Sequence, residues 1–414
     1  MSKASAAPEA KPKADAAGHA AFAVCTAAEF LFIHPAMFPR LLRFLSAALF
    51  GALWLVPAVR AQDSIKLGHY GAFTGKDGAF GSAARKGVIL AVEEVNAAGG
   101  VLGRPLELFS EDNQSKQGES ATIVKKFIAR DKVVAVLGGN ASTNSLEAAP
   151  ICQNARVPMI AISSTNPRVT EMGDYIFRVC FIDPFQGAVL AKFAHGRLGA
   201  RRVAILTSVS NPYAVGLSNV FRKQFTAAAG EIVAEQRYAE GDKDFRAQLT
   251  AIKAAGPDAI FASGYYTEGA LICKQARDLG ISAIIFGGDG WEAPELITLG
   301  GAAVEGTYYS AHYSKDSPAP EVVNFIKKFR TRWNGETPDG ISANGYDAVL
   351  LFVAALRRAG TTETVRLREA LAATKDFAGV TGRITIDAQR NAAKPAVILT
   401  VKDGRFQFVE SVAP

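Results

Sequence analysis

Cysteine and histidine are scarce in this sequence, which has four Cys and five His among 414 residues. The histidines after residue 61 are single residues, without an HxxxH or HExxH pair: His69, His195 and His312. The cysteines in the same part of the chain show no metal-ligand spacing: Cys152, Cys180 and Cys273. We therefore expect no metal site. We expect these cysteines to be small buried apolar residues, with at least one free thiol.

Motifs of common enzymes are also missing. The segment GAFTGK at residues 71–76 resembles a phosphate-binding loop, but Asp77 follows where Ser or Thr is required, and the glycine spacing is short. The pairs Gly99-Gly100 and Gly287-Gly288 lack the GxGxxG order of a dinucleotide site, and no GxSxG of a serine hydrolase occurs. We therefore expect a protein that is not an enzyme and has no cofactor.

The net charge is small once the amino-terminal region is set aside. Residues 1–61 hold six Lys and Arg and three Asp and Glu, which leaves 40 basic and 36 acidic residues, a net charge of +4, in the remainder. This excess is too weak and too dispersed to indicate nucleic-acid binding. After residue 61 no apolar run approaches the ~18 residues of a membrane span, so the sequence is not that of a membrane channel.

Two segments precede the part of the chain with globular patterning. Residues 1–36 are rich in Ala, Lys and Pro, and we interpret them as an upstream extension without packed structure. Met37 begins the pattern of a signal peptide at residues 37–61, in which a basic segment precedes an apolar run at 44–56 and the cleavage site Val59-Arg60-Ala61. An amphipathic helix is the alternative. No Cys follows the apolar run, so we expect no lipid anchor by that route and a mature protein free in the periplasm.

Apolar strand-like runs alternate with segments of helical period from Ile65 onward. The first block has strands at 65–70, 106–109, 133–137 and 158–162 and helices at 79–98, 115–130 and 143–155, the last interrupted by Pro150. The second block has strands at 203–207, 232–238, 258–262 and 283–286 and helices at 213–229, 244–255 and 267–279. Helices at 321–333, 342–359 and 364–372 and strands near 383–386 and 397–401 follow. This alternation predicts parallel sheets covered by helices, in two lobes with a ligand cleft between them.

Two strand-then-polar-loop units follow each other between residues 133 and 170. The first strand ends in Gly138-Gly139 and a cluster of hydroxyl and amide residues at 140–145, and the second ends in the segment SSTN at 163–166. Loops that leave neighbouring parallel strands meet in one crevice, where the start of a helix offers free N–H groups and a positive dipole end. The loops are therefore a candidate site for an anion such as a carboxylate. The alternative is that their Ser and Thr residues serve only as helix caps.

Several motifs occur in a specific order and spacing along the chain, although no one of them is decisive. They are GAFTGKDGAFG, KGVILAVEEVNAAGGVLGRPLEL, EDNQS, VVAVLGG, SSTNP, FRVCFID, GYY, QARDLG and GGDGW. Through these motifs the chain from Ile65 to about Gly404 resembles the periplasmic leucine/isoleucine/valine-binding protein family. Members of this family are the solute receptors of branched-chain amino-acid ABC transporters.

The resemblance implies the α/β fold of a type I periplasmic binding protein, with two Rossmann-like lobes whose parallel sheets are joined by three hinge crossings. The matching crossings fall near Asp183, His312 and Lys394. The implied N-terminal lobe comprises residues 62–183 plus 313–394, and the C-terminal lobe comprises residues 184–312 plus 395–414. Family members often carry a disulfide in the first lobe, but the cysteine pattern does not identify an equivalent pair here.

The resemblance also implies which residues hold an amino acid, whose charged groups need charge-assisted hydrogen bonds in place of water. The positions that match the carboxylate site are Thr143, Ser163, Ser164 and Thr165. The resemblance implies that Thr143 and Thr165 supply hydroxyls and that Ser163 supplies its backbone. The match for the ammonium site is Asp289 with Tyr265, although an Asp in a glycine-rich turn is by itself only a turn former. The implied side-chain pocket comprises Phe80, Tyr213 and Ile341, and loop aromatics of this kind also commonly cap a core edge. Such an apolar wall suits Leu, Ile, Val or Phe better than a charged amino acid.

We therefore expect a monomeric periplasmic receptor that captures a small neutral or branched-chain amino acid. The resemblance implies that it delivers this ligand to an inner-membrane ABC permease and performs no chemistry on it. The alternative is a receptor or sensor for an amide, a urea or an aromatic acid. Such ligands lack an α-ammonium group and would not need Asp289.

Overall fold

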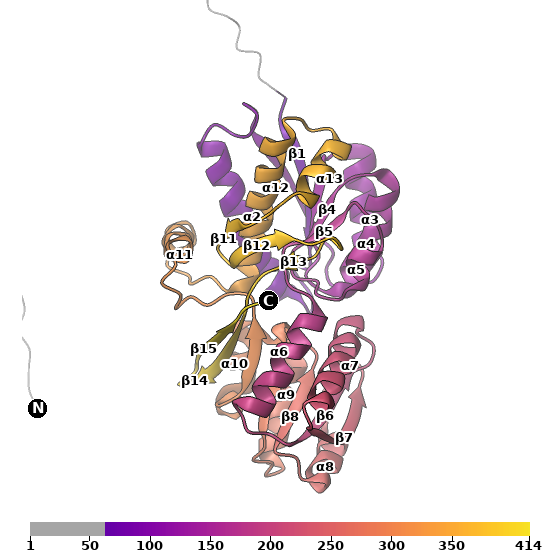
Figure 1. Cartoon of the computed structure of the whole chain (residues 1–414), viewed down its shortest axis with the longest axis vertical. Helices are drawn as coiled ribbons and strands as arrows, with labels where there is room; N and C mark the ends of the chain where they lie inside the picture. The colour runs from indigo at the N-terminus through magenta and orange to yellow at the C-terminus, as the bar shows by residue number, and fades with distance from the viewer. Residues whose placement is uncertain (1–62) are drawn as a thin grey trace, which may run out of the picture. The chain divides into compact units, whose positions relative to one another are not determined.

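The computed structural model describes residues 63–414, which lie within one compact unit (Figure 1). The predicted upstream extension of residues 1–36 and the predicted signal peptide of residues 37–61 lie outside the described residues. Within residues 63–414 no helix has both the length and the apolar character of a membrane span.

The first sheet has five parallel strands in the order β2-β1-β3-β4-β5. The strands are β1 (Ile65–Gly71), β2 (Leu106–Asp112), β3 (Ala135–Leu137), β4 (Met159–Ala161) and β5 (Ile176–Arg178). Every residue of β3, β4 and β5 is buried. Such continuous burial is typical of parallel strands that carry helices on both faces.

Helices cover both faces of the first sheet, and together they form the first lobe (Figure 1). Leu137 and Ile160 belong to the apolar core that includes α2 and α12, whereas their neighbours Val136 and Met159 pack with α3 and α4. Neighbouring residues in a strand point to opposite faces, so each strand supplies both cores. The helices of this lobe are α2 (Gly78–Ala97), α3 (Glu119–Lys126), α4 (Ser142–Ala155), α5 (Arg168–Glu171), α11 (Pro320–Arg332), α12 (Gly340–Ala359) and α13 (Thr364–Ala372).

The second sheet has seven strands in the order β15-β14-β10-β9-β8-β6-β7. The strands from β7 to β10 are parallel, and the antiparallel strands β14 and β15 extend the sheet beyond them. The strands are β6 (Arg202–Ser208), β7 (Glu231–Tyr238), β8 (Ala259–Ser263), β9 (Ile284–Gly287), β10 (Tyr308–Ala311), β14 (Ala396–Lys402) and β15 (Arg405–Val412). The helices of this second lobe are α6 (Asp183–Gly196), α7 (Pro212–Ala227), α8 (Arg246–Ala255), α9 (Tyr266–Asp278) and α10 (Pro294–Gly300).

The chain passes between the two sheets three times. After β5 it enters α6 and the second sheet, and after β10 it returns to α12 and α13, where α12 packs along α2. A small sheet of β11 (Phe377–Gly379), β12 (Gly382–Ile386) and β13 (Ala392–Ala393) precedes the last passage into β14. The predicted α/β fold class with two lobes and three crossings is confirmed.

Some local details differ from the sequence-based expectations. Pro150 does not interrupt its helix, because α4 continues from Ser142 to Ala155 around it and loses only the hydrogen bond that a proline cannot donate. Helix α6 was not predicted. The short strands β5 and β10 were not predicted either, since three or four residues give too little periodicity to recognise. The described cysteines, Cys152, Cys180 and Cys273, are all buried and free, as expected.

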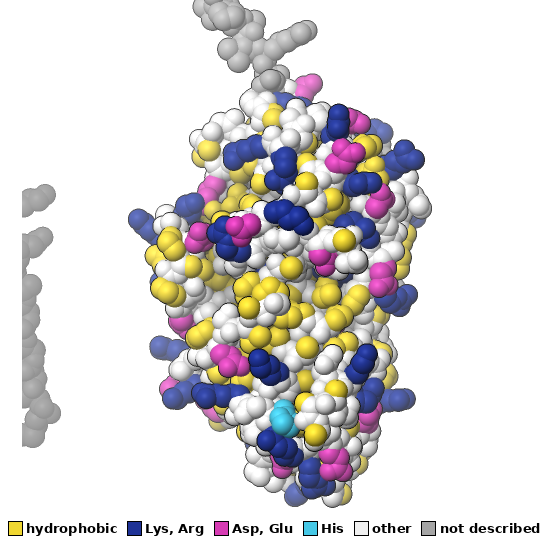
Figure 2. Space-filling model, viewed as in Figure 1, with side chains coloured by type: hydrophobic (Ala, Val, Ile, Leu, Met, Phe, Trp, Pro, Cys, Tyr) yellow, Lys and Arg dark blue, Asp and Glu magenta, His cyan; other side chains and the backbone are white. Residues whose placement is uncertain are grey.

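Charged side chains of both signs are interspersed over the face shown in Figure 2, which agrees with the small net charge. Apolar side chains gather instead midway along this face.

Candidate functional site

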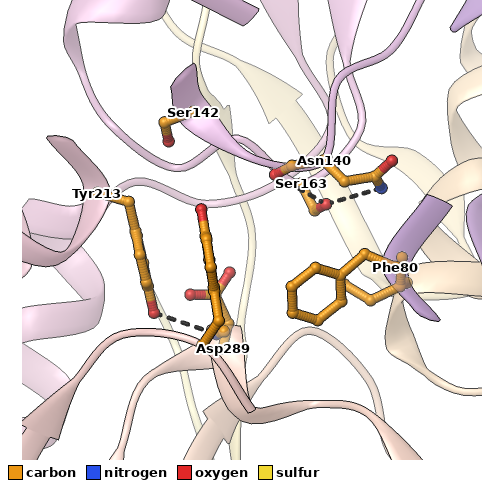
Figure 3. Close-up of a pocket in the computed structure, with 9 residues that line it drawn as sticks. Phe80, Asn140, Ser142, Ser163, Tyr213 and Asp289 are labelled. Atoms are coloured by element: carbon orange, nitrogen blue, oxygen red, sulfur yellow. Dashed lines mark hydrogen bonds between the residues drawn. The ribbon is translucent and has the colours of Figure 1, made fainter. Parts of the chain in front are cut away.

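A small cavity is lined by residues of both lobes (Figure 3). One side, the hydroxyl wall, consists of Asn140, Ser142 and Ser163. The facing side, the acidic wall, consists of Tyr213, Tyr265, Asp289 and Gly290. Phe80 and Ile341 of the first lobe complete the lining.

The hydroxyl wall includes the start of α4, which follows β3. The residue before this helix, Ala141, has no side chain that could cap the first turn. Among the described residues, the backbone N–H groups of Ser142 and Thr143 donate no hydrogen bond. The helix start therefore presents free donors and a positive dipole end beside the Ser142 side chain.

A buried arginine orients the second loop of the hydroxyl wall. The Arg178 guanidinium, on β5, donates to the carbonyl oxygens of Ser164 at 2.5 Å and Asn166 at 2.9 Å. In a planar trans peptide the C=O and the next N–H point in opposite directions, so the N–H of Thr165 points away from Arg178. That N–H also has no acceptor among the described residues. Burial lowers the pKa of Arg178, but a guanidinium stays charged at any physiological pH.

The two serines of this loop have different surroundings. Ser163 lines the cavity, and its Oγ accepts from Asn140 Nδ2 at 3.1 Å (Figure 3). The Ser164 Oγ lies 2.7 Å from Ser145 Oγ and 3.0 Å from the carbonyl oxygens of Gly139 and Ala141. The Ser164 hydroxyl therefore joins the two loops to each other and does not face the cavity.

Asp289 places a carboxyl group on the acidic wall, just after β9. Its backbone N–H donates to Gln186 Oε1 at 2.8 Å, and its Oδ2 lies 3.1 Å from His312 Nε2. The side chain is 5% exposed, and Oδ1 is a buried atom with no hydrogen-bond partner among the described residues. An unpartnered acceptor in a low-dielectric site is costly unless a ligand supplies a donor.

Aromatic rings surround Asp289 and meet across the two lobes. The Tyr213 and Tyr265 rings are stacked, with centroids 5.5 Å apart and planes 4° from parallel. Phe80 contacts the Tyr265 ring edge-on at 5.5 Å. The Tyr213 hydroxyl oxygen accepts the Gly290 N–H at 3.1 Å, and a Cβ at Gly290 would lie 2.6 Å from the carbonyl oxygen of Gly264. Burial raises the pKa of both tyrosines well above 10, so their hydroxyls stay neutral donors.

Direct contacts between the lobes hold the cleft closed in this structure. Asn166 Nδ2 donates to the Pro212 carbonyl oxygen at 2.8 Å, and the Tyr266 hydroxyl donates to the Lys76 carbonyl oxygen at 2.8 Å. The Gly340 N–H, at the start of α12, donates to Glu292 Oε1 at 2.7 Å. The cavity is therefore enclosed by groups that come together only when the lobes meet.

The structure brings together most of the site residues that were predicted from the sequence. Six of them line the cavity: Phe80, Ser163, Tyr213, Tyr265, Asp289 and Ile341. Thr143, Ser164 and Thr165 lie next to lining residues but do not line it themselves. Asn140, Ser142 and Gly290 do line it and were missed. The cluster at 140–145 was recognised as a whole, but the sequence does not show which of its side chains face inward.

Known proteins of similar sequence and structure share this architecture. Residues 64–405 match the family model described as periplasmic binding protein. The chain is 30% identical over 343 residues to Leu/Ile/Val-binding protein homolog 2 of Brucella abortus, an alignment that covers 81% of this chain and 91% of that protein.

Two solved structures are also similar. The leucine-binding protein LivK of Thermotoga maritima is 40% identical, with a TM-score of 0.81 over 84% of this chain and 99% of that chain. The branched-chain amino-acid transporter substrate-binding protein LivJ of Streptococcus pneumoniae, in complex with isoleucine, is 35% identical. Its TM-score is 0.81, over 85% of this chain and 100% of that chain.

Proposed function

The chain belongs to the periplasmic binding protein family, and we propose that it captures a small neutral or branched-chain amino acid in the cavity between its lobes. The observation that carries this proposal is the buried Asp289 Oδ1, an acceptor without a partner among the described residues. An α-ammonium group is a donor of the charge and size that this position requires.

The hydroxyl wall is the proposed site of the α-carboxylate. A carboxylate accepts hydrogen bonds from backbone N–H groups and hydroxyls, and the free N–H groups at Ser142, Thr143 and Thr165 supply such donors. Ser163 would add a hydroxyl from the cavity lining. The sequence-based assignment used the Thr143 and Thr165 hydroxyls and the Ser163 backbone. The proposal instead uses the backbone N–H groups of Thr143 and Thr165 and the Ser163 hydroxyl, and it gives Ser164 a supporting role.

The ligand side chain would lie against Phe80 and Ile341, which are apolar and buried. Burial of one aliphatic side chain contributes roughly 1.5–3 kcal/mol. Leucine and isoleucine are named as ligands of similar proteins. Together these points favour branched-chain amino acids over charged ones.

Ligand binding is proposed to be coupled to closure of the lobes. We assign residues 62–183 plus 313–394 to one moving body and residues 184–312 plus 395–414 to the other, with hinges near Asp183, His312 and Lys394. A ligand that contacts both walls has more affinity for the closed form, and this difference drives closure.

The cellular role follows from the family. We propose that residues 37–61 direct export to the periplasm and that the mature protein acts there as a monomer. The closed, loaded form would deliver the amino acid to an inner-membrane ABC permease without changing it chemically.

A thermal-shift screen tests this proposal. Protein that has been unfolded and refolded to remove carried-over ligand is melted with each amino acid, with 2-hydroxyisocaproate, with urea and with benzoate. A ligand at ~1,000 times its Kd adds about 4 kcal/mol to the free energy of unfolding, which raises the melting temperature measurably. We expect shifts with Leu, Ile, Val or Phe. A shift with only urea, benzoate or another ligand that lacks an α-ammonium would contradict the proposal.

A further inference from the structure

Among the described residues, the side chain within hydrogen-bond distance of the Asp289 carboxyl group is that of His312. Its Nε2 lies 3.1 Å from Asp289 Oδ2, and both side chains are buried. A carboxylate can only accept a hydrogen bond, so Nε2 must carry the hydrogen. The other ring nitrogen, Nδ1, has no partner among the described residues. The contact therefore fixes Oδ2 and leaves Oδ1 as the oxygen that is available to a ligand.

His312 lies at a passage between the lobes. It directly follows β10, which ends at Ala311. Its ring packs against Phe181, with centroids 3.9 Å apart, and Phe181 lies just before α6 at another passage. The group that orients Asp289 therefore lies on one of the three connections between the lobes and contacts a second one.

The backbone of Asp289 is held from the same region. Gln186, on α6, accepts through Oε1 both the Asp289 N–H and the Ser310 hydroxyl, each at 2.8 Å. The Gln186 Nε2 donates to Asp183 Oδ1 at 3.5 Å. Gln186 therefore holds the backbone of Asp289 in place, whereas His312 fixes the rotation of its carboxyl group.

The structure assigns His312 as a positioning residue that sets the selectivity of the cavity for an α-ammonium group. This assignment rests on the proposed amino-acid function. His312 turns Asp289 so that Oδ1 is presented to the ligand, and it does so with a neutral donor. A Lys or Arg in its place would neutralise Asp289 and compete with the ammonium for the same charge.

The surroundings of His312 keep it neutral. Burial lowers the pKa of the imidazole below its usual value, and the nearby Lys394 ammonium acts in the same direction. The carboxyl of Asp289 opposes this effect but does not outweigh burial. His312 therefore donates its hydrogen bond without placing a positive charge beside Asp289.

The test compares a matched ligand pair across variants of the full protein. Leucine and 2-hydroxyisocaproate differ only in ammonium against hydroxyl, and the ratio of their Kd values, measured by calorimetry, is the selectivity. His312→Phe keeps a ring against Phe181 but removes the donor, and His312→Gln restores an N–H donor. His195→Phe, on α6 away from the cavity, is the matched control.

We expect His312→Phe to lower the selectivity by about tenfold or more, the effect of losing one charge-assisted hydrogen bond. His312→Gln should recover most of this selectivity, and His195→Phe should leave it unchanged. A purely structural role for His312 would weaken both ligands equally and leave the ratio intact, which would overturn the assignment. If His312→Phe keeps the selectivity but Asp289→Asn loses it, the amino-acid function stands and the role of His312 does not.

Two further outcomes are decisive. A wild-type protein that does not prefer leucine to the hydroxy acid would overturn both the assignment and the proposed function. Nitrogen-15 spectra of the wild-type imidazole, identified by its loss in His312→Gln, should show the proton on Nε2. A proton on Nδ1 would overturn the assignment even if the Phe variant failed to fold.

Discussion

The two walls of the cavity are built in opposite ways. The hydroxyl wall carries no formal charge, and its own lobe supports it. The Ser164 hydroxyl joins the two loops, and Arg178 holds carbonyl oxygens of the second loop. The acidic wall carries one buried carboxyl, and Gln186 and His312, at the connections between the lobes, hold it in place. The hydroxyl wall is therefore supported within its own lobe, whereas the acidic wall is held by residues at the connections between the lobes.

This difference has an energetic consequence. A buried carboxylate with one unpaired oxygen is costly, because it has lost its hydration without a full set of partners. A ligand ammonium offsets that cost only when the lobes are closed. We infer that the acidic wall makes closure depend on the ligand, whereas the hydroxyl wall is ready in either state.

The largest expected effect comes from removing the charge of the acidic wall. Asp289→Asn keeps the shape of the side chain but leaves a ligand ammonium without its counter-charge, which costs about 2–5 kcal/mol of binding free energy. Calorimetry with leucine should show this loss, while the melting temperature without ligand stays the same or rises. Asp244→Asn, at a side chain that is 66% exposed, is the control. Wild-type affinity in Asp289→Asn would show that this carboxyl group does not hold the ammonium.

The next effect concerns the support of the hydroxyl wall. Arg178→Met removes the charged donor to the carbonyl oxygens of Ser164 and Asn166, and each lost hydrogen bond should cost about 1.5–3 kcal/mol. The two oxygens keep their other donors, Cys180 Sγ at 3.4 Å and the Val169 N–H at 3.1 Å. Chemical denaturation should show the lower free energy of unfolding. Arg197→Met, at an exposed position, should change little. A variant as stable as the wild type would mean that the loop does not depend on Arg178.

Two neighbouring serines allow a finer comparison within the hydroxyl wall. Ser163→Ala removes a cavity hydroxyl, and we expect about 1 kcal/mol weaker leucine binding with stability nearly unchanged. Ser164→Ala removes the hydroxyl that joins the loops, so about 1 kcal/mol should be lost from the free energy of unfolding instead. The two measurements are calorimetry and denaturation. If both substitutions changed leucine binding and the free energy of unfolding equally, Ser163 and Ser164 would not have the different roles assigned to them here.

A pH effect is expected at the rim of the cleft. Burial, together with Glu240 and Glu268 of the second lobe, raises the pKa of Asp77 to about 7 against the opposing charge of Lys76. An unfolded Asp titrates near ~4, so the folded protein holds an extra proton at pH values between the two pKa values. Its stability should therefore fall as the pH rises through 7, by about 1 kcal/mol between about pH 6 and pH 8.

Asp77→Asn removes this titration. Denaturation curves of the variant should lose that part of the pH dependence, whereas those of Asp244→Asn should keep it. An unchanged pH dependence in Asp77→Asn would assign the titration to another group.

The sequence predicted the fold better than the details of the site. Buried apolar runs such as Val136 and its neighbours in β3 identify parallel strands locally, so the α/β alternation was recognised. The sequence-based assignment to the carboxylate site included Thr143 and not Ser142. Which of these two side chains faces the cavity depends on the rotation of α4 about its axis, and the sequence does not show this rotation. His312 was set aside as a single histidine, since its contact with Asp289 spans 23 residues and arises only from the packing of β10 beside β9. Such long-range pairs leave no local pattern in a sequence.

The central claim is that Asp289 pairs with the ammonium group of an amino acid, and a four-way binding cycle tests it most directly. The Kd values of leucine and 2-hydroxyisocaproate are measured for the wild type and for Asp289→Asn. We predict that exchanging ammonium for hydroxyl weakens binding strongly in the wild type and little in the variant, a coupling of about 1.5–3 kcal/mol. An equal cost of the exchange in both proteins would contradict the claim.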